Sequence, residues 1–285
     1  MVLPYTVLDV FTHTPLAGNA LAVVHEADGL DEETMQRFAR ETRLSETTFV
    51  QAPDADGADY RNRIFMMAGE LAFAGHPSLG TAVAVAHARG EREARYVQQT
   101  PAGLQPIDVE LAGRTARASM LQEPVVFGPE LDPAHVLGIV GLSAADAHPE
   151  LVPQVVATGV PQVVVLVADS AALDRAVVAT REPLAELLGE HGAVTLYVAH
   201  WDPANGHASA RSWFAEPAAV TEDPATGAAA GPLMAYLHAR AGAASVSIDQ
   251  GVAMGRPSRL DCAIEGDRVR VGGEAVILAE GRLHL

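Results

Sequence analysis

The stretch EDPATGAAAGPL at residues 222–233 decides the fold, because a related stretch, GHPSLGTA, occurs earlier at residues 75–82. A shift of 147 positions, from 77 to 224, brings Pro77 onto Pro224 and also matches a glycine and an alanine that follow. A repeat with such a long period indicates a duplicated domain and not a solenoid of short units. We therefore expect two related halves, each built around one copy.

Each copy has the composition of a helix start. Proline is favoured at the first helical position, so Pro77 and Pro224 predict helices that begin there. Asp223 is then expected to be the N-cap of the second helix, and the repeat puts His76 at the same place in the first. Small residues follow both prolines, and a helix that is apolar on all sides is buried. We expect two buried helices whose first N–H groups can bind an anion.

The composition limits the kind of protein and the kind of partner. The chain has 285 residues, of which 49% are hydrophobic, and this is enough for two domains with substantial cores. It carries 36 acidic and 19 basic residues, a formal charge of −17. This charge argues against nucleic acid or an anionic membrane as the partner. A small anion stays possible, because helix N-termini supply positive potential without formal charge.

The single cysteine and the N-terminus bear on localisation. One cysteine, Cys262, cannot form a disulfide within the chain and suits a reducing compartment. Its alternating surroundings, LDCAI, predict a small buried residue of a strand. The first residues, MVLPY, lack the basic and apolar regions of a signal peptide, and no apolar run approaches the ~20 residues of a membrane span. We expect a soluble cytoplasmic protein without a membrane partner.

The pattern of elements is α+β and not alternating βαβ. Both halves contain several short strands around one Ala/Gly-rich helix, at residues 76–89 in the first half and 223–240 in the second. A loop-like stretch near residues 122–129 marks the domain change. Near the C-terminus, separate strands are expected at 268–272 and 275–278.

The chain lacks the usual cofactor and metal motifs. No dinucleotide fingerprint, phosphate loop, HExxH or GxSxG motif is present, and the eleven histidines show no ligand spacing. We therefore expect neither a metal nor a cofactor.

Five segments of the chain form an ordered set. They are DVF at 9–11 with GNALAVV at 18–24, LSETTFV at 44–50, ELAFAGHPSLGTA at 70–82, EDPATG at 222–227, and QG at 250–251 with GRP at 255–257. Taken in this order, they resemble the PhzF-like family of isomerases of phenazine biosynthesis. One segment alone would be a weak signal, whereas the ordered set is specific and spans most of the chain.

The resemblance implies a diaminopimelate-epimerase-like fold. This α+β fold has two pseudo-symmetric lobes, each a curved β-sheet around a central helix. The expected N-terminal lobe comprises residues 1–122, with residues 277–285 packed on it, and the C-terminal lobe comprises residues 123–276. The active site is expected in the cleft between the lobes. We also expect a homodimer.

The resemblance also implies roles for three ionisable side chains. The glutamate that matches Glu46 is the acid/base that moves a proton, and the residues that match His76 and Asp223 assist it. A glutamate at the start of a strand, taken alone, is usually a solvated surface residue, so the assignment of Glu46 depends on its motif. A neutral His76 suits a helix start, because the helix dipole disfavours imidazolium there.

Further residues are expected to hold the substrate. For Asn19, a role in a tight turn and a role in substrate binding both stay open. Ala228 stands where the best-studied members of the family have serine, so one hydroxyl donor is missing. The expected substrate-binding residues are Asn19, Ser45, Gly75, Gly227 and Ala228.

The function expected from these features is cofactor-independent isomerisation by proton transfer on a small carboxylate. In the family's named reaction the substrate is a dihydro-hydroxyanthranilate. Epimerisation at an amino- or hydroxy-acid carbon and a catalytically inactive small-metabolite binding protein are the alternatives. A two-thiol racemase is excluded, because the expected helix starts carry His76 and Asp223 and not cysteines.

Overall fold

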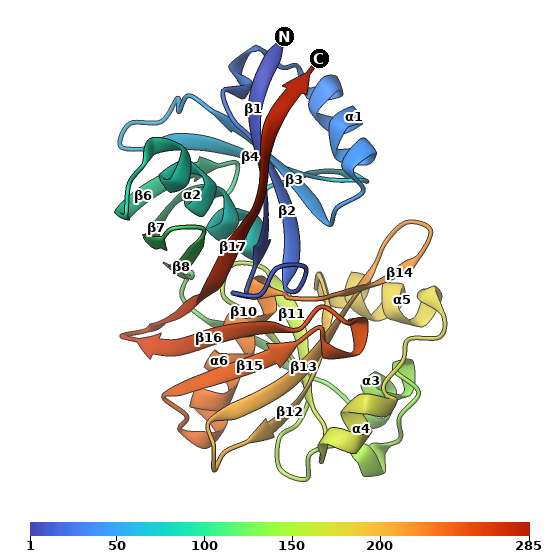
Figure 1. The fold of residues 1–285 in the computed structure, drawn as a ribbon. Coiled ribbons are helices and arrows are strands. Elements are labelled where there is room, and N and C mark those ends of the chain that lie inside the picture. The colour runs from blue at the N-terminus through green and yellow to red at the C-terminus, as the bar shows by residue number, and fades with distance from the viewer. The chain divides into compact units, whose positions relative to one another are not determined.

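The computed structural model describes all residues 1–285, which form two compact units (Figure 1). Unit 1 comprises Met1–Leu121 and Gly272–Leu285, and unit 2 comprises Gln122–Val271. Strand β17 (Arg268–His284) begins in unit 2 and continues into unit 1. None of the helices combines the length and the apolar character that crossing a bilayer requires.

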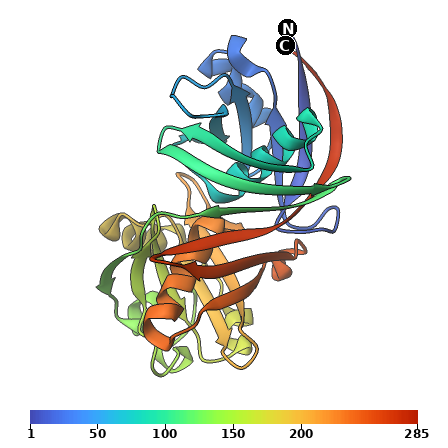
Figure 2. The same ribbon diagram turned by 90° about the vertical axis from the view of Figure 1, so that its left-hand side faces the viewer.

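Unit 1 is a curved sheet around one helix. Antiparallel and parallel neighbours run in the order β17, β1, β2, β3, β4, β6, β7, β8, and β8 pairs with β17, so the sheet closes on itself. Figure 2 shows β6, β7 and β8 side by side along this sheet. The strands are β1 (Val2–Val10), β2 (Asn19–Val24), β3 (Glu46–Gln51), β4 (Tyr60–Met66), β5 (Gly69–Leu71), β6 (Glu93–Thr100), β7 (Gly103–Ala112) and β8 (Thr115–Leu121), and the helices are η1 (Ala27–Gly29), α1 (Glu32–Thr42) and α2 (Gly75–Arg89).

Helix α2 lies inside this sheet, and all its residues from Gly75 to Ala86 are buried. The small residues make this possible: a Cβ on Gly80 would approach the side chain of Leu21 to 2.6 Å. The helix ends at Gly90, whose φ of 70° is the left-handed conformation typical of a C-cap glycine. The prediction of a buried first helix is confirmed.

Unit 2 has a second sheet and a second buried helix. The sheet runs in the order β9, β10, β11, β12, β13, β15, β16, with β14 forming a hairpin with the end of β13. A separate apolar cluster lies between this sheet and helices α3, α4 and α5. The strands are β9 (Val126–Glu130), β10 (Gln154–Ala157), β11 (Pro161–Leu166), β12 (Leu196–Asp202), β13 (His207–Ala215), β14 (Val220–Asp223), β15 (Ser245–Gln250) and β16 (Ser258–Glu265), and the helices are α3 (Pro133–Ile139), η2 (Ala144–Asp146), α4 (Ser170–Arg175), α5 (Arg181–His191), α6 (Gly227–Ala241) and η3 (Val252–Met254).

Helix α6 is the second buried helix, but it begins later than the sequence predicted. Asp223 is the last residue of β14, and α6 begins at Gly227 with Thr226 as its N-cap residue. The prediction that Asp223 caps this helix is therefore wrong. Pro224 does not start the helix, because residues 224–226 form a connecting turn between the strand and the helix.

Helix α2 also begins differently from the prediction. Its N-cap residue is Ala74, so His76 is the second residue of the helix and Pro77 the third. Pro77 is tolerated there because the first N–H groups of a helix have no intrahelical partner.

The two helices correspond at a different offset from the one the motif suggested. Each has 15 residues, and an offset of 152 residues (75 to 227, and 90 to 242) relates both their starts and their C-cap glycines. The motif offset of 147 matched prolines and glycines that occupy different places in the two elements. At the helix offset, the residue equivalent to His76 is Ala228.

One strand prediction near the C-terminus is also wrong. The two strands expected at 268–272 and 275–278 are a single strand, β17, which is 17 residues long. Gly272 does not interrupt it. A Cβ at this position would lie 2.8 Å from the carbonyl oxygen of Ala118, so glycine permits a close approach of the two chains.

Candidate active site

Three of the predicted side chains meet in unit 1. Asn19 begins β2 and Glu46 begins β3, and these strands are parallel neighbours with Leu21 opposite Glu46. His76 lies in the first turn of α2. The Nδ1 of His76 is 3.2 Å from the Nδ2 of Asn19, and its Nε2 is 3.0 Å from the Oε2 of Glu46. The imidazole ring thus lies between an amide and a carboxylate.

The amide of Asn19 fixes the tautomer of the His76 ring. An amide nitrogen can only donate a hydrogen bond, so the Nδ1 of His76 must accept it. The proton of the neutral ring is then on Nε2, the nitrogen that faces Glu46. The N–H group of the neutral ring is therefore on the same side of the ring as Glu46, without a hydrogen bond to it.

The contact between His76 and Glu46 is close without being a hydrogen bond. The two atoms are 3.0 Å apart, yet neither the Nε2 of His76 nor the Oε2 of Glu46 has a hydrogen-bond partner. The pair is therefore a close contact and not a hydrogen bond. Both side chains are largely enclosed, with exposed fractions of 6% for His76 and 15% for Glu46. The Nε2 of His76 and the Oε2 of Glu46 thus retain their hydrogen-bonding capacity for a ligand.

The start of α2 adds backbone donors to this group. No side chain caps the helix, so the N–H groups of Gly75 and His76 are not used by a cap. The hydroxyl of Ser78 instead donates to the carbonyl of Ala74 at 2.7 Å, and Gln98 donates to Ser78 at 2.7 Å. Ser45, also expected at the site, is exposed, and no hydrogen bond uses its side chain.

In unit 2, Asp223 takes part in a hydrogen-bond network. The hydroxyl of Thr226 donates to the Oδ2 of Asp223 at 2.6 Å. The side chain of Gln250 donates to the carbonyl of Asp223 at 2.8 Å and to the Thr226 hydroxyl at 3.0 Å, and its Oε1 accepts from the N–H of Thr226 at 3.1 Å. The hydroxyl of Tyr197 donates to the same Oε1 at 3.0 Å. These bonds satisfy the backbone N–H of Thr226 and the carbonyl of Asp223, in place of a helix cap.

Close packing and burial support this network. Burial raises the pKa of Tyr197 well above its usual value, so the hydroxyl stays protonated as a donor. Gly251, which follows Gln250, has a φ of 73°, and a Cβ there would lie 2.6 Å from the carbonyl oxygen of Pro224. The turn that carries Asp223 is therefore packed directly against the backbone of Gly251.

The remaining predicted residues of unit 2 lie in the first turn of α6. The carbonyl of Gly227 accepts a hydrogen bond from Gln122 at 2.9 Å. Ala228 is partly exposed, and no side chain caps α6. This helix start also leaves backbone N–H groups available for an anion.

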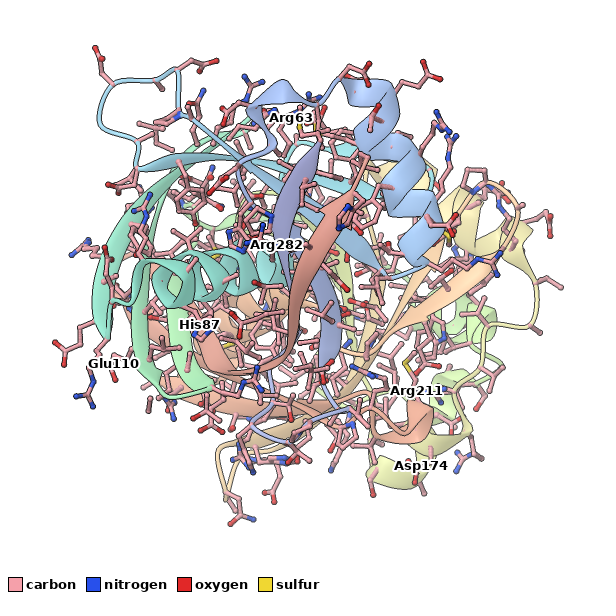
Figure 3. All side chains as sticks on the ribbon, turned by 45° about the horizontal axis from the view of Figure 1, so that its top comes forward. Arg63, His87, Glu110, Asp174, Arg211 and Arg282 are labelled. Atoms are coloured by element: carbon pink, nitrogen blue, oxygen red, sulfur yellow. The ribbon has the colours of Figure 1, made fainter.

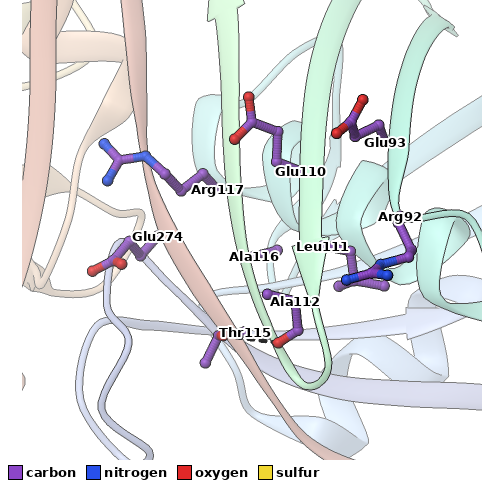
Figure 4. Close-up of a pocket in the computed structure, with 9 residues that line it drawn as sticks. All are labelled: Arg92, Glu93, Glu110, Leu111, Ala112, Thr115, Ala116, Arg117 and Glu274. Atoms are coloured by element: carbon purple, nitrogen blue, oxygen red, sulfur yellow. Dashed lines mark hydrogen bonds between the residues drawn. The ribbon is translucent and has the colours of Figure 1, made fainter.

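No other candidate site combines a shielded carboxylate with a histidine at a helix start. A depression on the outer face of unit 1 is lined by charged side chains, and none of the predicted site residues lines it (Figure 4). In it Glu110 stands opposite Glu93 on one neighbouring strand and opposite Arg117 on the other. Cys262 is buried, and burial raises the pKa of its thiol. No three His, Cys, Asp or Glu side chains are gathered as a metal ion would require.

A family model described as phenazine biosynthesis-like protein matches residues 8–281. The chain belongs to this family. A trans-2,3-dihydro-3-hydroxyanthranilate isomerase from Pseudomonas aeruginosa is 36% identical over 297 residues, which cover 99% of each protein. The crystal structure of a PhzF-family phenazine biosynthesis protein from Bacillus anthracis matches with a TM-score of 0.87 at 25% identity and covers 100% of both chains.

These relatives bear out the main expectations for this PhzF-family protein. The expected family and the expected enzyme class, an isomerase, are confirmed. A hydroxyproline epimerase from Agrobacterium vitis shares the fold, with a TM-score of 0.64 at 13% identity over 99% of this chain and 92% of that one. The expected epimerase-like fold is thus confirmed.

Some residues that shape the site were not found from the sequence. Gln250 was noted only as part of a QG pair, and Tyr197 and Thr226 were not singled out. The motif at 222–227 does contain Thr226, so its hydroxyl could have been considered as a partner of Asp223. The contact from Gln250 depends on the positions of β15 and β14 in the fold, and nothing local in the sequence predicts it.

Proposed function

We propose that this PhzF-family protein is a cofactor-independent isomerase in which Glu46 moves a proton on a small carboxylate substrate. The observation that carries the proposal is the contact of Glu46 with His76 at 3.0 Å, in which neither facing atom has a hydrogen-bond partner. The Glu46 carboxylate accepts a proton from a substrate carbon, becomes a carboxylic acid, and returns the proton to another carbon. The substrate's bonding electrons shift between these two positions, so the step needs no oxidant or reductant.

His76 is proposed to assist Glu46. With its proton on Nε2 and no partner there in the structure, the ring donates a hydrogen bond to a substrate oxygen on which charge develops. Asn19 keeps the ring in this tautomer and is thereby assigned a positioning role. This assignment favours function over a simple turn for Asn19, which the sequence left open.

Asp223 is proposed to take part in proton handling for the same reaction. Its carboxylate is buried and accepts from the hydroxyl of Thr226 at 2.6 Å. The N–H groups at the starts of α2 and α6, at Gly75 and Gly227, are proposed to bind the carboxylate of the substrate. Ala228 would contribute only its backbone N–H group, and Ser45 stays a proposed contact at the edge of the site.

The proposed substrate is trans-2,3-dihydro-3-hydroxyanthranilate. It is the compound in the name of the Pseudomonas aeruginosa relative, which is 36% identical over nearly its whole length. The full-length match supports transfer of the reaction. Two pseudo-symmetric lobes, which the common 152-residue offset of α2 and α6 supports, complete the proposed architecture.

Incubation of this substrate with the enzyme in D₂O tests the proposal. We expect conversion to an isomer, with deuterium at the carbon that receives the proton, detected by NMR and mass spectrometry. Deuterium at a single inverted centre without rearrangement would instead indicate an epimerase, and binding without turnover or exchange would indicate a binding protein. Either result would refute the proposed reaction.

A cytoplasmic homodimer completes the proposal, as expected from the sequence. Light scattering after gel filtration should give twice the mass of one chain. A monomer mass across a hundredfold range of protein concentration would contradict the dimer.

A further inference from the structure

An arginine of unit 1 holds the hairpin that leads into α2. Arg63 lies on β4, and its Nε and Nη2 atoms donate to the two carboxylate oxygens of Glu70 on β5, at 2.7 and 2.6 Å. The guanidinium also lies over the ring of Phe65, at 5.2 Å from its centroid. A second carboxylate, from Glu32, accepts from Nη2 at 3.0 Å. The side chains of Arg63 and Glu70 are 13% and 23% exposed, so this pair is mostly shielded from water, whereas Glu32 is exposed.

An arginine of unit 2 makes the same two-point pair with a glutamate and the same contact with an aromatic ring. Arg211 lies on β13, and its Nε and Nη2 donate to the two oxygens of Glu222 on β14, both at 2.8 Å. Its guanidinium lies over the ring of Trp213, at 4.9 Å from the centroid. Nη1 donates to the carbonyl of Ala176 at 2.5 Å. The exposed fraction is again 13%.

The two groups also agree in strand register. Phe65 is directly opposite Glu70, and Trp213 is directly opposite Glu222, each in an antiparallel pair. In both units the arginine is two residues before the aromatic residue, so all three side chains lie on one face of the hairpin. We name each set an Arg–aromatic–Glu clamp. Arg63 and Arg211 are labelled in Figure 3.

Each clamp sits directly before a proposed functional segment. Glu222 adjoins Asp223, the last residue of β14. Glu70 precedes α2, which carries His76 in its first turn. The offset from Glu70 to Glu222 is 152 residues (70 to 222), the same offset that relates α2 to α6. The arginines (63 to 211) and the aromatic residues (65 to 213) are 148 residues apart, because the second hairpin has the longer loop. The clamps therefore belong to the repeated framework and occupy equivalent places in it.

Such an ion pair is not expected to add much to the stability of the fold. A shielded ion pair often contributes little net stability, because removing both charges from water offsets their attraction. A two-point Arg–carboxylate pair with a stacked ring does fix direction, because its planar fork permits one geometry. We therefore expect the clamps to fix the direction of the hairpins and to contribute little to stability.

We propose that Arg63–Phe65–Glu70 and Arg211–Trp213–Glu222 are equivalent positioning devices, which set the hairpins that present His76 and Asp223 for proton transfer. This inference rests on the proposed function. The four charged residues are assigned no part in the chemistry itself, and they act through the segments that follow them. The effect is expected to be larger for the Asp223 clamp, because Glu222 is its immediate neighbour.

The test compares clamp variants with exposed ion pairs of the same kind. Glu222→Gln and Glu70→Gln each remove one carboxylate charge. Glu130→Gln, which breaks a pair with Arg240 in unit 2, and Asp54→Asn, which breaks a pair with Arg61 on β4, are the controls. Steady-state kinetics with trans-2,3-dihydro-3-hydroxyanthranilate gives kcat and KM, and hydrogen exchange with mass spectrometry follows residues 220–227 and 70–78.

We expect kcat of Glu222→Gln to fall by roughly ten- to a hundredfold, because misplacement by about 1 Å can cost that much. Glu70→Gln should show a smaller fall, KM should change less than kcat, and both controls should stay within about twofold of the parent. Exchange should rise in residues 220–227 of Glu222→Gln and in residues 70–78 of Glu70→Gln.

A third variant separates fork geometry from charge. Arg211→Lys keeps the opposite charges, and so also serves if Glu222→Gln does not fold. We expect it to lose kcat as Glu222→Gln does. Wild-type kcat in Arg211→Lys, or clamp variants that match the controls in both kcat and exchange, would overturn the inference. If the parent enzyme does not turn over this substrate, the proposed function fails, while the exchange measurement still decides whether the clamps order these segments.

Discussion

Replacement of Gln250 by leucine should be among the most damaging single changes in unit 2. The Gln250 side chain is 1% exposed and makes four hydrogen bonds. Its oxygen accepts from Tyr197 and from the N–H of Thr226, and its nitrogen donates to the carbonyl of Asp223 and to the Thr226 hydroxyl. Leucine is slightly larger and has none of this capacity, so the change chiefly removes polar partners.

The size of the effect follows from the groups that lose their partner. The Tyr197 hydroxyl, the Thr226 N–H and the Asp223 carbonyl would each be left buried, and each such group costs about 1–3 kcal/mol. We expect Gln250→Leu to lower the free energy of unfolding by roughly 4 kcal/mol. A typical domain has about 5–15 kcal/mol of stability, so the variant should still fold.

Urea unfolding of four proteins checks this estimate. In the Gln250→Leu background, Tyr197→Phe removes one of the unpaired groups and should restore about 1–2 kcal/mol. In the parent background, Tyr197→Phe should lower stability. A loss below about 1 kcal/mol in Gln250→Leu, or a Tyr197→Phe effect of the same sign and size in both backgrounds, would refute the proposed network.

Two further predictions follow from burial and from backbone conformation. Burial lowers the pKa of His25 to about 4, so the unfolded chain takes up a proton from about pH 6.5 downward while the folded protein does not. The stability lost between pH 7.5 and pH 5 should therefore be about 2 kcal/mol greater in the parent than in His25→Gln. Urea unfolding at both pH values measures this difference. An equal loss in the two proteins would contradict this. Gly251 and Gly255 have φ values of 73° and 71°, but only at Gly251 would a Cβ meet backbone, at 2.4 Å from the Arg256 carbonyl oxygen. Gly255→Ala should therefore lower the free energy of unfolding by about 1 kcal/mol, and Gly251→Ala should lower it by at least about 2 kcal/mol more. Thermal unfolding compares the two variants. Similar melting temperatures would show that the close approach at Gly251 has no energetic consequence.

The fold was predictable to the extent that its signals are local. Ala- and Gly-rich stretches after Pro77 and Pro224 indicated two buried helices, and α2 and α6 are buried. The offset between them was wrong, because matching residue types aligned a proline inside the first turn of α2 with a proline in the turn before α6. The difference arises from the β13–β14 hairpin and the Gln250 contacts, which depend on pairings across the sheet.

In the candidate site, too, the residues in local motifs were predicted and those that depend on strand pairing were not. Glu46, His76 and Asn19 were predicted from their motifs, and the structure brings these three together in unit 1. Arg211 and Glu222 are 11 residues apart, and their pairing depends on the register that places Trp213 opposite Glu222. A register is set by the packing of a whole hairpin, so a search for local motifs does not find such a clamp.

The role of Glu46 is the central claim, and the turnover of Glu46→Gln tests it most directly. Glutamine keeps the size of the side chain and cannot accept the proton. With trans-2,3-dihydro-3-hydroxyanthranilate in D₂O, we expect kcat to fall by about 10²–10⁴ and deuterium incorporation to fall with it. Glu41→Gln, a change at an exposed residue at the end of α1, should leave both unchanged. Near-normal turnover and deuterium incorporation in folded Glu46→Gln would contradict the proposed mechanism.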